Sequence, residues 1–501
     1  MIIPRRRNPN LLLIHGAAVF FLPKEGYILH YRLKDNYILR GWEKLPYAVV
    51  DVRTGEASFL TSQRMKALEL CDGNIDVSMP FITDDIRGLI SEYEKNGLIE
   101  QCEQGRGLNE NQKYKKYPCR YIHDVHWAIT LRCNYRCKHC FISVPHAKIF
   151  ELPHDKVMEI INQLSEYGVM QVSLTGGEPF IRDDFFDIID ALKERNITVS
   201  YINTNGSFIT ERVLNEFIKR DVRPVFYISY DGKGWHDWLR GINGAEEKVN
   251  RTLELCRDMG FPVNATMVIH KGNSHTLRES INHLASLGVP SLTTLYAANV
   301  GEWLKRNNQE SMSIEDMCNM YLEYLPHYYE DGMPMSVKFT SFFSASKKRP
   351  DKYNITCYRE EYDPCNYVLC STIRSYAYIS PEGRVLPCTV FDGFDIREDY
   401  PTIFEKPFAE CVSAPNFMNI VKMTTSELHK ANEQCRTCKF NKHCQGGCRP
   451  SVLYLGEKNL MATNKIECSL FYGGWIKKIA ETVQKARPGA ECPVKDLSML
   501  Q

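Results

Sequence analysis

The sequence predicts an α/β protein built around a partial (β/α)6 TIM-like barrel. Three observations predict it. From about Tyr121 onward, strand-like and helix-like patterns alternate; a polar stretch poor in apolar residues precedes them; and beyond about Thr340 the alternation gives way to loops and clustered cysteines. We therefore expect a winged-helix-like domain at 1–104, a linker at 105–120, the barrel at 121–339, a cysteine-rich domain at 340–490 and a tail at 491–501.

The barrel is predicted from six strand-like segments separated by helical ones. The expected strands are Val125–Leu131, Met170–Thr175, Thr198–Asn203, Pro224–Tyr230, Pro262–Ile269 and Ser291–Tyr296. The expected helices include Asp184–Arg195, Thr210–Lys219, Ala245–Met259 and Thr276–Leu287, with a final helix around Ser469–Lys485. Six βα units in succession imply a parallel sheet, and chemistry in such a barrel takes place at the carboxyl ends of its strands.

The N-terminal domain is predicted from a hairpin, two helices and a returning strand. Residues Tyr47–Leu60 form the expected hairpin, with its turn at 54–55. A short helix is expected to end before Gly73, and Thr83 is expected to cap a second helix that ends near Gly97. This order of elements is typical of a small winged-helix fold.

The first residues imitate a signal peptide only faintly. Arg5–Arg7 precede an apolar run from Leu11 to Leu22, but His15 interrupts the run and no clear small-residue cleavage site follows. We interpret the run as a buried strand or hairpin.

Composition limits the classes of function. The chain has 501 residues, 44% of them hydrophobic and 25% charged, with a formal net charge of +1. A neutral balance gives no electrostatic footprint for nucleic acid or an anionic membrane, and no apolar run is long enough to span a bilayer. The 19 cysteines, odd in number and clustered towards the C-terminus, do not suggest a secreted disulfide scaffold. We expect a cytoplasmic protein whose cysteines ligate metal.

Three cysteines follow the first predicted strand in the sequence CNYRCKHC, with the spacing CxxxCxxC. Cys133, Cys137 and Cys140 can hold three irons of a [4Fe–4S] cluster and leave the fourth iron without a protein ligand. The amine and carboxylate of an amino acid can chelate that iron and place a sulfonium beside an electron donor. One-electron cleavage of the carbon–sulfur bond releases a 5′-deoxyadenosyl radical, which abstracts hydrogen from unactivated carbon.

Zinc is the alternative for this motif. Zinc sites usually bring four ligands in paired short spacings, which a three-cysteine loop fits poorly. His139 lies between two of the cysteines, and we expect it to pack near the cofactor rather than to ligate.

The CxxxCxxC loop after the first strand of a six-unit barrel resembles the radical S-adenosylmethionine (radical SAM) superfamily. Gly176, Gly177 and Glu178 follow the second strand and are similar to the family's GGE motif, which contacts the methionine amine of the cofactor. Glycines let the backbone approach a ligand closely, and a carboxylate suits an ammonium group.

Three further residues are similar to cofactor-contacting positions of that family. Ser229 and Asp231, in YISYDG after the fourth strand, resemble residues near the ribose, and Arg240 resembles one that reaches the cofactor carboxylate. A simple turn at Asp231 and a surface position for Arg240 are the alternatives. Residues 203–206 close the third strand and are expected to line the same mouth.

A second set of cysteines occupies the C-terminal block. Cys370 precedes a Gx4C motif that ends at Cys388, and the spacing Cx2Cx5Cx3C then leads to a closing Cys468. This arrangement resembles the SPASM domain, which in its family holds two auxiliary [4Fe–4S] clusters. A zinc ribbon is the alternative for its central part.

The SPASM resemblance implies which cysteines hold each auxiliary cluster, and so three clusters in all. The far cluster would take Cys435, Cys438, Cys444 and Cys468. The near cluster would take Cys370, Cys388, Cys448 and a fourth ligand, either Cys365, which we prefer, or Cys357. If neither binds, the near cluster has an open iron that a substrate thiolate could occupy.

The segment from about Tyr27 to Gln104 resembles a precursor-peptide recognition element, carried by VVDVRTGEASFL, ALELCDG and NGLIEQ. Such modules bind a leader peptide as an added strand at a sheet edge. DNA binding and a purely structural cap are the alternatives. Because acidic residues balance the basic ones in this segment, no basic face for DNA is expected.

Together these resemblances predict a radical SAM enzyme that matures a ribosomally made peptide, with a leader-bearing precursor and an electron donor such as flavodoxin or ferredoxin as partners. The expected product is a thioether, as in sactipeptide or ranthipeptide synthesis; carbon–carbon crosslinking and epimerisation are alternatives. Sulfatase maturation is disfavoured because Thr389 replaces the aspartate that follows the Gx4C cysteine in that family. A zinc-ribbon DNA-binding regulator and a simple electron-transfer protein are the other classes. No catalytic acid or base is evident.

Overall fold

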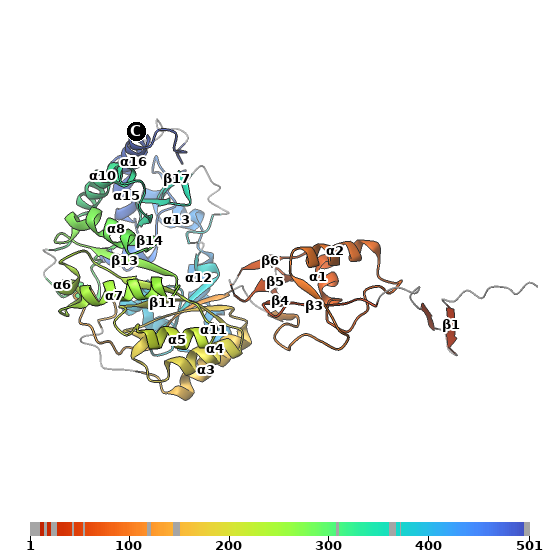
Figure 1. Cartoon of the computed structure of the whole chain (residues 1–501). Helices are drawn as coiled ribbons and strands as arrows, with labels where there is room; N and C mark the ends of the chain where they lie inside the picture. Colours follow the sequence, from red (N-terminus) through yellow and green to blue (C-terminus); the bar gives the residue numbers. More distant parts are fainter. Residues whose placement is uncertain are drawn as a thin grey trace, which may run out of the picture. The chain divides into compact units, whose positions relative to one another are not determined.

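The computed structural model describes residues 11–14, 18–21, 28–42, 45–53, 56–117, 122–143, 151–306, 310–359, 367–370 and 372–494 (Figure 1). The chain divides into two compact units. Unit 1 comprises Met1–Tyr121 with Arg195–Thr198, and unit 2 comprises Ile122–Glu194 with Val199–Gln501. Each unit is described by itself. The expected turn at 54–55 and Cys365 lie outside the described residues.

Unit 1 is a small α+β assembly. Its strands are β1 (Leu11–Ile14), β2 (Ala18–Phe21), β3 (His30–Leu33), β4 (Tyr37–Trp42), β5 (Ala48–Asp51), β6 (Ala57–Phe59), β7 (Ile99–Cys102) and β8 (Lys115–Tyr117). The antiparallel pair β1–β2 forms a hairpin in the N-terminal apolar run, as predicted. Strands β3 and β7 pair antiparallel, and β6, β5, β4 and β8 form a four-stranded sheet.

The two predicted helices of unit 1 are present. Helix α1 (Ser62–Glu69) begins after Thr61, whose side chain accepts a hydrogen bond from the Arg64 N–H. Helix α2 (Asp84–Lys95) begins directly after Thr83, as expected, although that side chain makes no capping hydrogen bond. Both helices contribute to one apolar core with β3 and β7. The winged-helix topology itself stays a prediction.

The segment predicted as a linker is folded over much of its length. Strand β8 lies inside that segment and pairs in parallel with β4. Gln112, which is 2% exposed, donates hydrogen bonds to the carbonyl groups of Leu33, Lys34 and Tyr37. One buried polar side chain thus ties an otherwise largely exposed segment to the backbone of unit 1, and composition alone does not distinguish this from a solvated linker.

Unit 2 is organised by one sheet with the strand order β17-β16-β15-β14-β13-β12-β11-β10-β9-β18-β19. Its strands are β9 (Asp124–Ala128), β10 (Gln171–Thr175), β11 (Thr198–Thr204), β12 (Val225–Ser229), β13 (Val263–Ile269), β14 (Ser291–Tyr296), β15 (Ser336–Phe339), β16 (Phe343–Ser346), β17 (Arg349–Ile355), β18 (Tyr376–Ile379) and β19 (Val385–Leu386). The six predicted strands are β9 to β14, in chain order, and those pairs whose direction is known are parallel.

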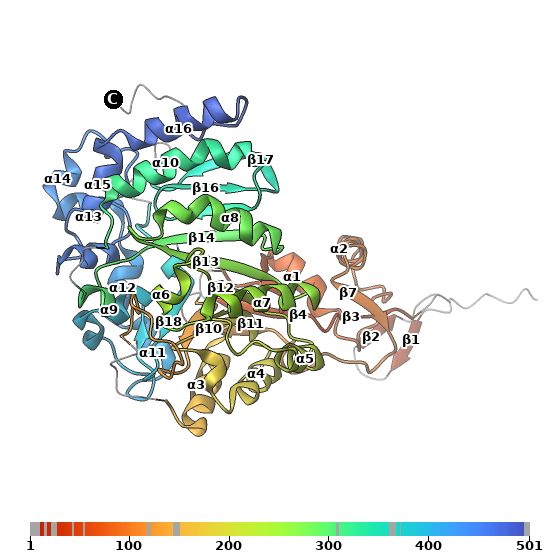
Figure 2. The same ribbon diagram turned by 60° about the vertical axis from the view of Figure 1, so that its left-hand side comes forward.

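The helices of the barrel follow its strands. They are α3 (His154–Tyr167), α4 (Phe185–Glu194), α5 (Glu211–Lys219), α6 (His236–Arg240), α7 (Ala245–Asp258), α8 (Leu277–Ser286), α9 (Gly301–Leu304) and α10 (Ile314–Glu330). Figures 1 and 2 show α3, α4, α5, α7 and α8 along one face of the sheet. The C-terminal block adds α11 (Phe408–Ser413), α12 (Pro415–Lys422), α13 (Thr425–Ala431), α14 (Glu433–Arg436), α15 (Lys465–Tyr472) and α16 (Trp475–Ala486).

The single helix expected around Ser469–Lys485 is two helices instead. Helix α15 ends at Tyr472 and α16 starts at Trp475, because Gly473 and Gly474 interrupt them and Gly474 has a positive φ of 67°. Figure 2 shows α16 beside α10 at the end of the sheet that carries β16 and β17.

The two faces of the parallel sheet differ in character. Side chains that face the helices are apolar and fully buried, such as Val125, Trp127 and Val172. Positions of the opposite parity are largely polar, and His126 and Ser173 meet there through a 2.6 Å hydrogen bond. Parallel sheets covered on both faces are apolar on both. The polar face therefore lines the lumen of the partial barrel.

The cysteine-rich block is joined directly to the barrel sheet. Strand β18 pairs in parallel with β9, with Tyr376 opposite Asp124, and continues antiparallel into β19. No helix among the described residues is both long and apolar enough to cross a bilayer.

Candidate radical-generating site

The three cysteines of the first motif lie together in the loop after β9. Burial and then the neighbouring Cys137 and Cys140 raise the pKa of the Cys133 thiol to about 12. The Tyr135 N–H donates to the Cys133 sulfur at 3.4 Å, and the Cys140 N–H donates to the Cys137 carbonyl at 3.2 Å. Thiols must lose their protons to bind iron, so cluster binding here releases protons.

Helix α6 is hydrogen-bonded to the outer part of this loop. The Arg136 and Lys138 N–H groups donate to the carbonyl oxygens of Arg240 and Leu239, at 3.1 and 2.8 Å. Gly241 follows the helix with a φ of 68°, and a Cβ there would lie 2.4 Å from the Arg136 carbonyl oxygen. Only glycine permits this approach.

Arg240 and Asp231 form a buried ion pair behind the cysteines. The Arg240 Nε lies 2.6 Å from Asp231 Oδ2, and its Nη1 lies 3.8 Å from the Cys137 sulfur. Burial alone would raise the pKa of Asp231, but the Arg240 charge and a hydrogen bond with His236 hold it well below its usual range. Asp231 is completely buried and also accepts the Val268 N–H at 2.9 Å, so it is no surface turn. Arg240 is 8% exposed and is therefore no surface arginine.

The glycines of the GGE motif pack against the start of the cysteine loop. A Cβ on Gly176 would lie 2.4 Å from the Thr130 carbonyl oxygen, and one on Gly177 would lie 2.2 Å from that of Arg132. The Gly177 and Glu178 N–H groups donate to these two oxygens, each at 2.8 Å. In this structure the glycines position the loop through backbone contact.

Glu178 is fully buried at the end of the same segment. Its carboxylate accepts from the Asn205 N–H at 2.8 Å and from the Thr204 hydroxyl at 2.9 Å, so the expected 203–206 loop lies at this mouth. Burial raises the pKa of Glu178 to about 7, although these hydrogen bonds act to lower it. An ammonium group beside it would favour the carboxylate. Ser229 lies half-buried at the end of β12, on the lumen face.

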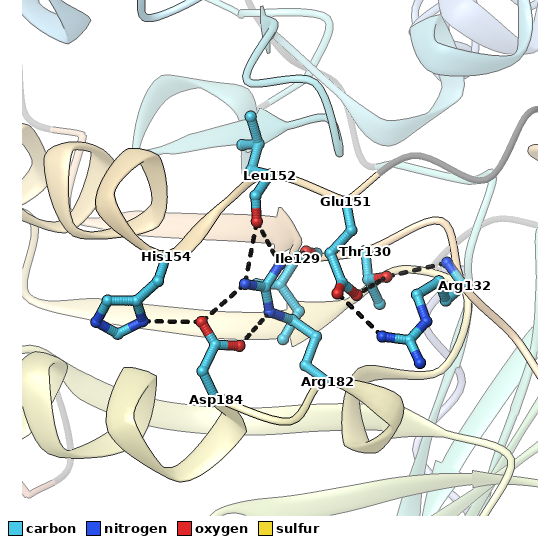
Figure 3. Close-up of polar contacts among 8 residues, drawn as sticks. All are labelled: Ile129, Thr130, Arg132, Glu151, Leu152, His154, Arg182 and Asp184. Atoms are coloured by element: carbon cyan, nitrogen blue, oxygen red, sulfur yellow. Dashed lines mark hydrogen bonds and ion pairs between the residues drawn. The ribbon is translucent and has the colours of Figure 1, made fainter.

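A polar network that sequence reasoning missed anchors both ends of the loop (Figure 3). Arg182 donates to the carbonyl oxygens of Ile129 and Leu152 at 3.0 and 3.2 Å and pairs with Asp184. Asp184 also contacts the ring of His154 at 2.9 Å. Arg182 follows Glu178 by four positions, but no spacing signal identified it.

The other half of the network braces the first cysteine. Glu151 accepts from the Thr130 hydroxyl at 2.7 Å and from Arg132 at 3.1 Å, immediately before Cys133 (Figure 3). The loop is thus held on one side by α6 and on the other by these carboxylates.

The far cysteine set surrounds a small cavity of about 30 Å³. Its lining includes Cys435, Cys438, Cys444 and Cys468. The Gly446 N–H donates to the Cys444 sulfur at 3.3 Å, and the Phe440 N–H donates to the Cys438 sulfur at 3.4 Å. Such N–H···S contacts are typical of thiolates that bind iron–sulfur clusters.

The near cysteine set is also brought together. Burial raises the pKa of Cys388 to about 12, and Cys448 and Cys370 are charged neighbours that raise it further. Burial raises the pKa of Cys357, the alternative fourth ligand, and its strongest charged neighbours are Glu467, which also neighbours Cys448 of the near set, and Cys444 of the far set. Because Cys365 lies outside the described residues, the fourth near ligand stays a prediction.

A cavity of about 290 Å³ lies between the radical loop and the near set. Its walls include His139, Phe141, Leu295, Tyr296, Cys448, Tyr454 and Glu467. The Tyr454 ring meets the rings of Phe141 and Tyr296 edge-on, each at 6.4 Å between centroids. A larger cavity of about 620 Å³ lies between α8 and α10, and no cysteine is among its described lining residues.

The donor sets fit clusters better than single ions. Within the described part of the chain, no three Cys, His, Asp or Glu side chains converge tightly enough to hold one metal ion. A [4Fe–4S] cube separates its thiolate ligands more widely than a single ion does.

Comparison with protein families agrees with this geometry. Residues 127–284 match the Radical SAM superfamily, and residues 370–439 match SPASM, an iron–sulfur cluster-binding domain. The barrel and its cysteine loop thus define a radical SAM enzyme, which uses S-adenosylmethionine and a [4Fe–4S] cluster. More narrowly, the chain carries a SPASM domain in addition to its Radical SAM domain.

Known proteins resemble most of the chain. Fe-coproporphyrin III synthase of Methanosarcina barkeri is 25% identical over 378 residues, covering 70% of this chain and 90% of that protein. PqqA peptide cyclase of Bradyrhizobium diazoefficiens is 23% identical over 333 residues, covering 64% and 80%. The crystal structure of Streptococcus suis SuiB bound to precursor peptide SuiA has a TM-score of 0.62 at 15% identity, covering 87% of this chain and 99% of that one.

The likeness to SuiB is one of fold, and the part of this chain that it covers extends beyond unit 2. The covered share of this chain exceeds the share that lies in unit 2. The shared fold therefore includes part of unit 1.

Proposed function

We propose that this enzyme modifies a ribosomally made precursor peptide, whose leader is bound by unit 1 and whose core enters the barrel lumen. The names of two relatives support this, since one is a PqqA peptide cyclase and the other was crystallised with its precursor peptide. A fold shared with SuiB in part of unit 1 also supports it, because a leader-binding module needs more than the barrel.

The observation that carries the proposal is the cavity beside the radical loop. Fe-coproporphyrin III synthase is the competing relative, and a coproporphyrin is a large macrocycle with four carboxylates. The cavity holds about 290 Å³, and its described lining contains Glu467 but neither lysine nor arginine. Such a site suits an uncharged amino-acid side chain better than an anionic macrocycle, because buried carboxylates need cationic partners.

The chain's own residues organise the chemistry. When bound, S-adenosylmethionine and its cluster supply a 5′-deoxyadenosyl radical that removes a hydrogen atom from substrate. Glu178, oriented by Thr204 and Asn205, would accept hydrogen bonds from the cofactor's ammonium group. Arg240, with Ser229 and Asp231 on the adjoining strand end, would lie beside the rest of the cofactor. The aromatic walls of the cavity keep water from the reacting carbon.

The finer proposal is a thioether product, with three clusters in the enzyme. Cys448 belongs to the near set and also lines the cavity, so a substrate sulfur beside Cys448 would lie near the carbon that loses hydrogen. The bond would form between the substrate sulfur and that carbon, and a cluster held by Cys370, Cys388 and Cys448 would supply an acceptor for the remaining electron. Carbon–carbon crosslinking remains the alternative product.

The test is anaerobic incubation of the reconstituted enzyme with reductant, S-adenosylmethionine and the precursor peptide encoded beside its gene, followed by mass spectrometry. A loss of two hydrogens per event, together with a cysteine that no longer reacts with alkylating agent, is expected for a thioether. Loss of hydrogens with a freely alkylated cysteine would reject the thioether but keep the crosslink. Unmodified peptide, with formation of Fe-coproporphyrin III instead, would overturn the proposed substrate class.

A further inference from the structure

The outer surface of the radical loop carries a concentration of positive charge. Asn134 and Arg136 are exposed between the first two cysteines, whereas the sulfur atoms themselves are half-buried. Lys138 follows, with its Nζ 4.2 Å from the ring centroid of Trp238. Trp238 is a large aromatic side chain that is 36% exposed on α6.

Helix α9 brings two more cations to the same loop. The Glu302 N–H donates to the Cys140 carbonyl at 2.9 Å, which fixes α9 against the third cysteine. Lys305 reaches Ser143 at 3.4 Å and pairs with Glu302 at 2.7 Å. Arg306 follows directly, is exposed, and its N–H donates to the Trp303 carbonyl at 3.2 Å.

These residues are more basic than the protein as a whole. Of the four cations Arg136, Lys138, Lys305 and Arg306, Lys305 pairs with Glu302, whose side chain is 6% exposed. Near the ring of Trp238, the described residues also include Glu310, which contacts His270. The whole chain has a formal net charge of only +1. Holding like charges together costs free energy in the folded protein, so a cationic cluster around an exposed aromatic ring indicates a binding surface for an anionic partner.

We propose that Arg136, Lys138, Lys305, Arg306 and the exposed ring of Trp238 form the docking surface for an acidic one-electron carrier protein. The inference rests on the radical SAM class of the enzyme and does not depend on which substrate it modifies. The carrier, a reduced flavin or iron–sulfur protein, loses one electron and the radical-generating cluster gains it. Docking at this surface places the carrier directly over the loop that holds that cluster, and opposite charges steer the encounter.

The test compares two reductants on the anaerobically reconstituted enzyme, with cluster bleaching followed by stopped-flow absorbance. One is an acidic flavodoxin in its hydroquinone form, and the other is reduced methyl viologen, a small cation that needs no protein surface. For Arg136→Glu/Arg306→Glu, we expect reduction by flavodoxin at low ionic strength to slow about tenfold or more, with reduction by methyl viologen unchanged or faster. The matched control is Arg212→Glu/Lys219→Glu on α5, where both side chains are exposed.

The outcomes separate the docking surface from the rest of the enzyme. An unchanged flavodoxin rate in the reversal variant, or an equal loss in the α5 control, would overturn the proposal. If reduction by both reductants slows in the reversal variant, the loop itself is damaged. The same comparison is then made with Arg136→Gln/Arg306→Gln, which removes the charges without reversing them. In the parent enzyme the flavodoxin rate must fall as salt rises from about 50 to about 500 mM, and a salt-independent rate would also refute the surface. Failure of methyl viologen to support 5′-deoxyadenosine formation would count against the radical site, not against docking.

Discussion

Close backbone approach at single residues sets the geometry of the radical loop. Gly177 lies where its backbone donates to the Thr130 carbonyl, and its missing Cβ leaves room for the Arg132 carbonyl. The family resemblance gives the GGE glycines a role at the cofactor. The structure adds a second reason for them, since they also fix the segment that leads into Cys133.

Gly177→Ala should therefore disturb the cluster as well as the fold. Its Cβ would meet backbone atoms of Arg132 at 2.2 and 2.7 Å, so the loop must shift, and we expect a loss of about 1–3 kcal/mol in the free energy of unfolding. Thermal unfolding and iron and sulfide content per chain measure both effects. The control is Gly88→Ala in helix α2. There, no heavy atom outside the neighbouring helix backbone lies within 4 Å of the added Cβ, so the change should be neutral or stabilising. Equal iron content and midpoint for the parent and Gly177→Ala would contradict this role.

Residue-level prediction reached the reactive residues but not the residues that support them. Cysteines at fixed spacings indicate their chemistry, so Cys133, Cys137 and Cys140 could be proposed as cluster ligands from their spacing and their place after a strand, and that assignment stays a prediction. Arg182 and Glu151 could not, because a buried arginine that binds carbonyl groups has no spacing signature. Nor could composition distinguish Gln112, bound to backbone in unit 1, from a solvated linker residue.

At the scale of elements, the barrel strands have apolar residues on one face and largely polar residues on the other. Their alternation of apolar and polar residues is unusual for a parallel sheet, and it could have indicated a polar lumen from sequence. On the lumen face the ring of His126 lies 5.8 Å from that of Tyr201 and 6.3 Å from that of Tyr376. Strand β18, by contrast, is only four residues long, and its insertion beside β9 had no local signal.

Burial of His126 on β9 should make stability depend on pH. Burial lowers the pKa of His126 to about 4, from an ordinary value of about 6.5, so the unfolded chain binds more protons between these values. Stability from this residue is therefore present above pH 6.5 and is lost as the pH falls towards 4. From pH 7 to pH 5 the loss should be about 2 kcal/mol.

The measurement is the difference in thermal midpoint between the parent and His126→Phe across that pH range. A comparison with the variant is needed because Asp124, on the same face, also titrates in this range. Burial raises the pKa of Asp124 to about 6, so its protonation stabilises the folded protein as the pH falls, whereas protonation of His126 destabilises it. The variant should lose less stability than the parent between pH 7 and pH 5. Parallel pH profiles for the two proteins would show that His126 is not the titrating group.

At the scale of the whole molecule, the division into two units predicts that radical generation and leader binding can be separated. A chain that begins at Ile122 should still cleave S-adenosylmethionine when reduced with dithionite, because all cysteines of the proposed clusters lie in unit 2. It should lose most modification of a full-length precursor, by about tenfold or more, if unit 1 binds the leader. Product mass spectrometry with 5′-deoxyadenosine assay distinguishes the two activities. Undiminished modification by the shortened enzyme would remove unit 1 from peptide recognition.

The pairing of β18 with β9 has a consequence for any attempt to recombine this enzyme. Neighbouring parallel strands lie about 4.8 Å apart, and one leads into the radical loop while the other leads through β19 into the near cysteines. The distance between the radical loop and the near cysteines is therefore set by the pairing of neighbouring strands, not by a hinge. A chimera that exchanges one C-terminal block for another must reproduce the alignment of Tyr376 with Asp124. A shift of two positions would move the near cysteines about 6.6 Å along the sheet, away from the substrate position.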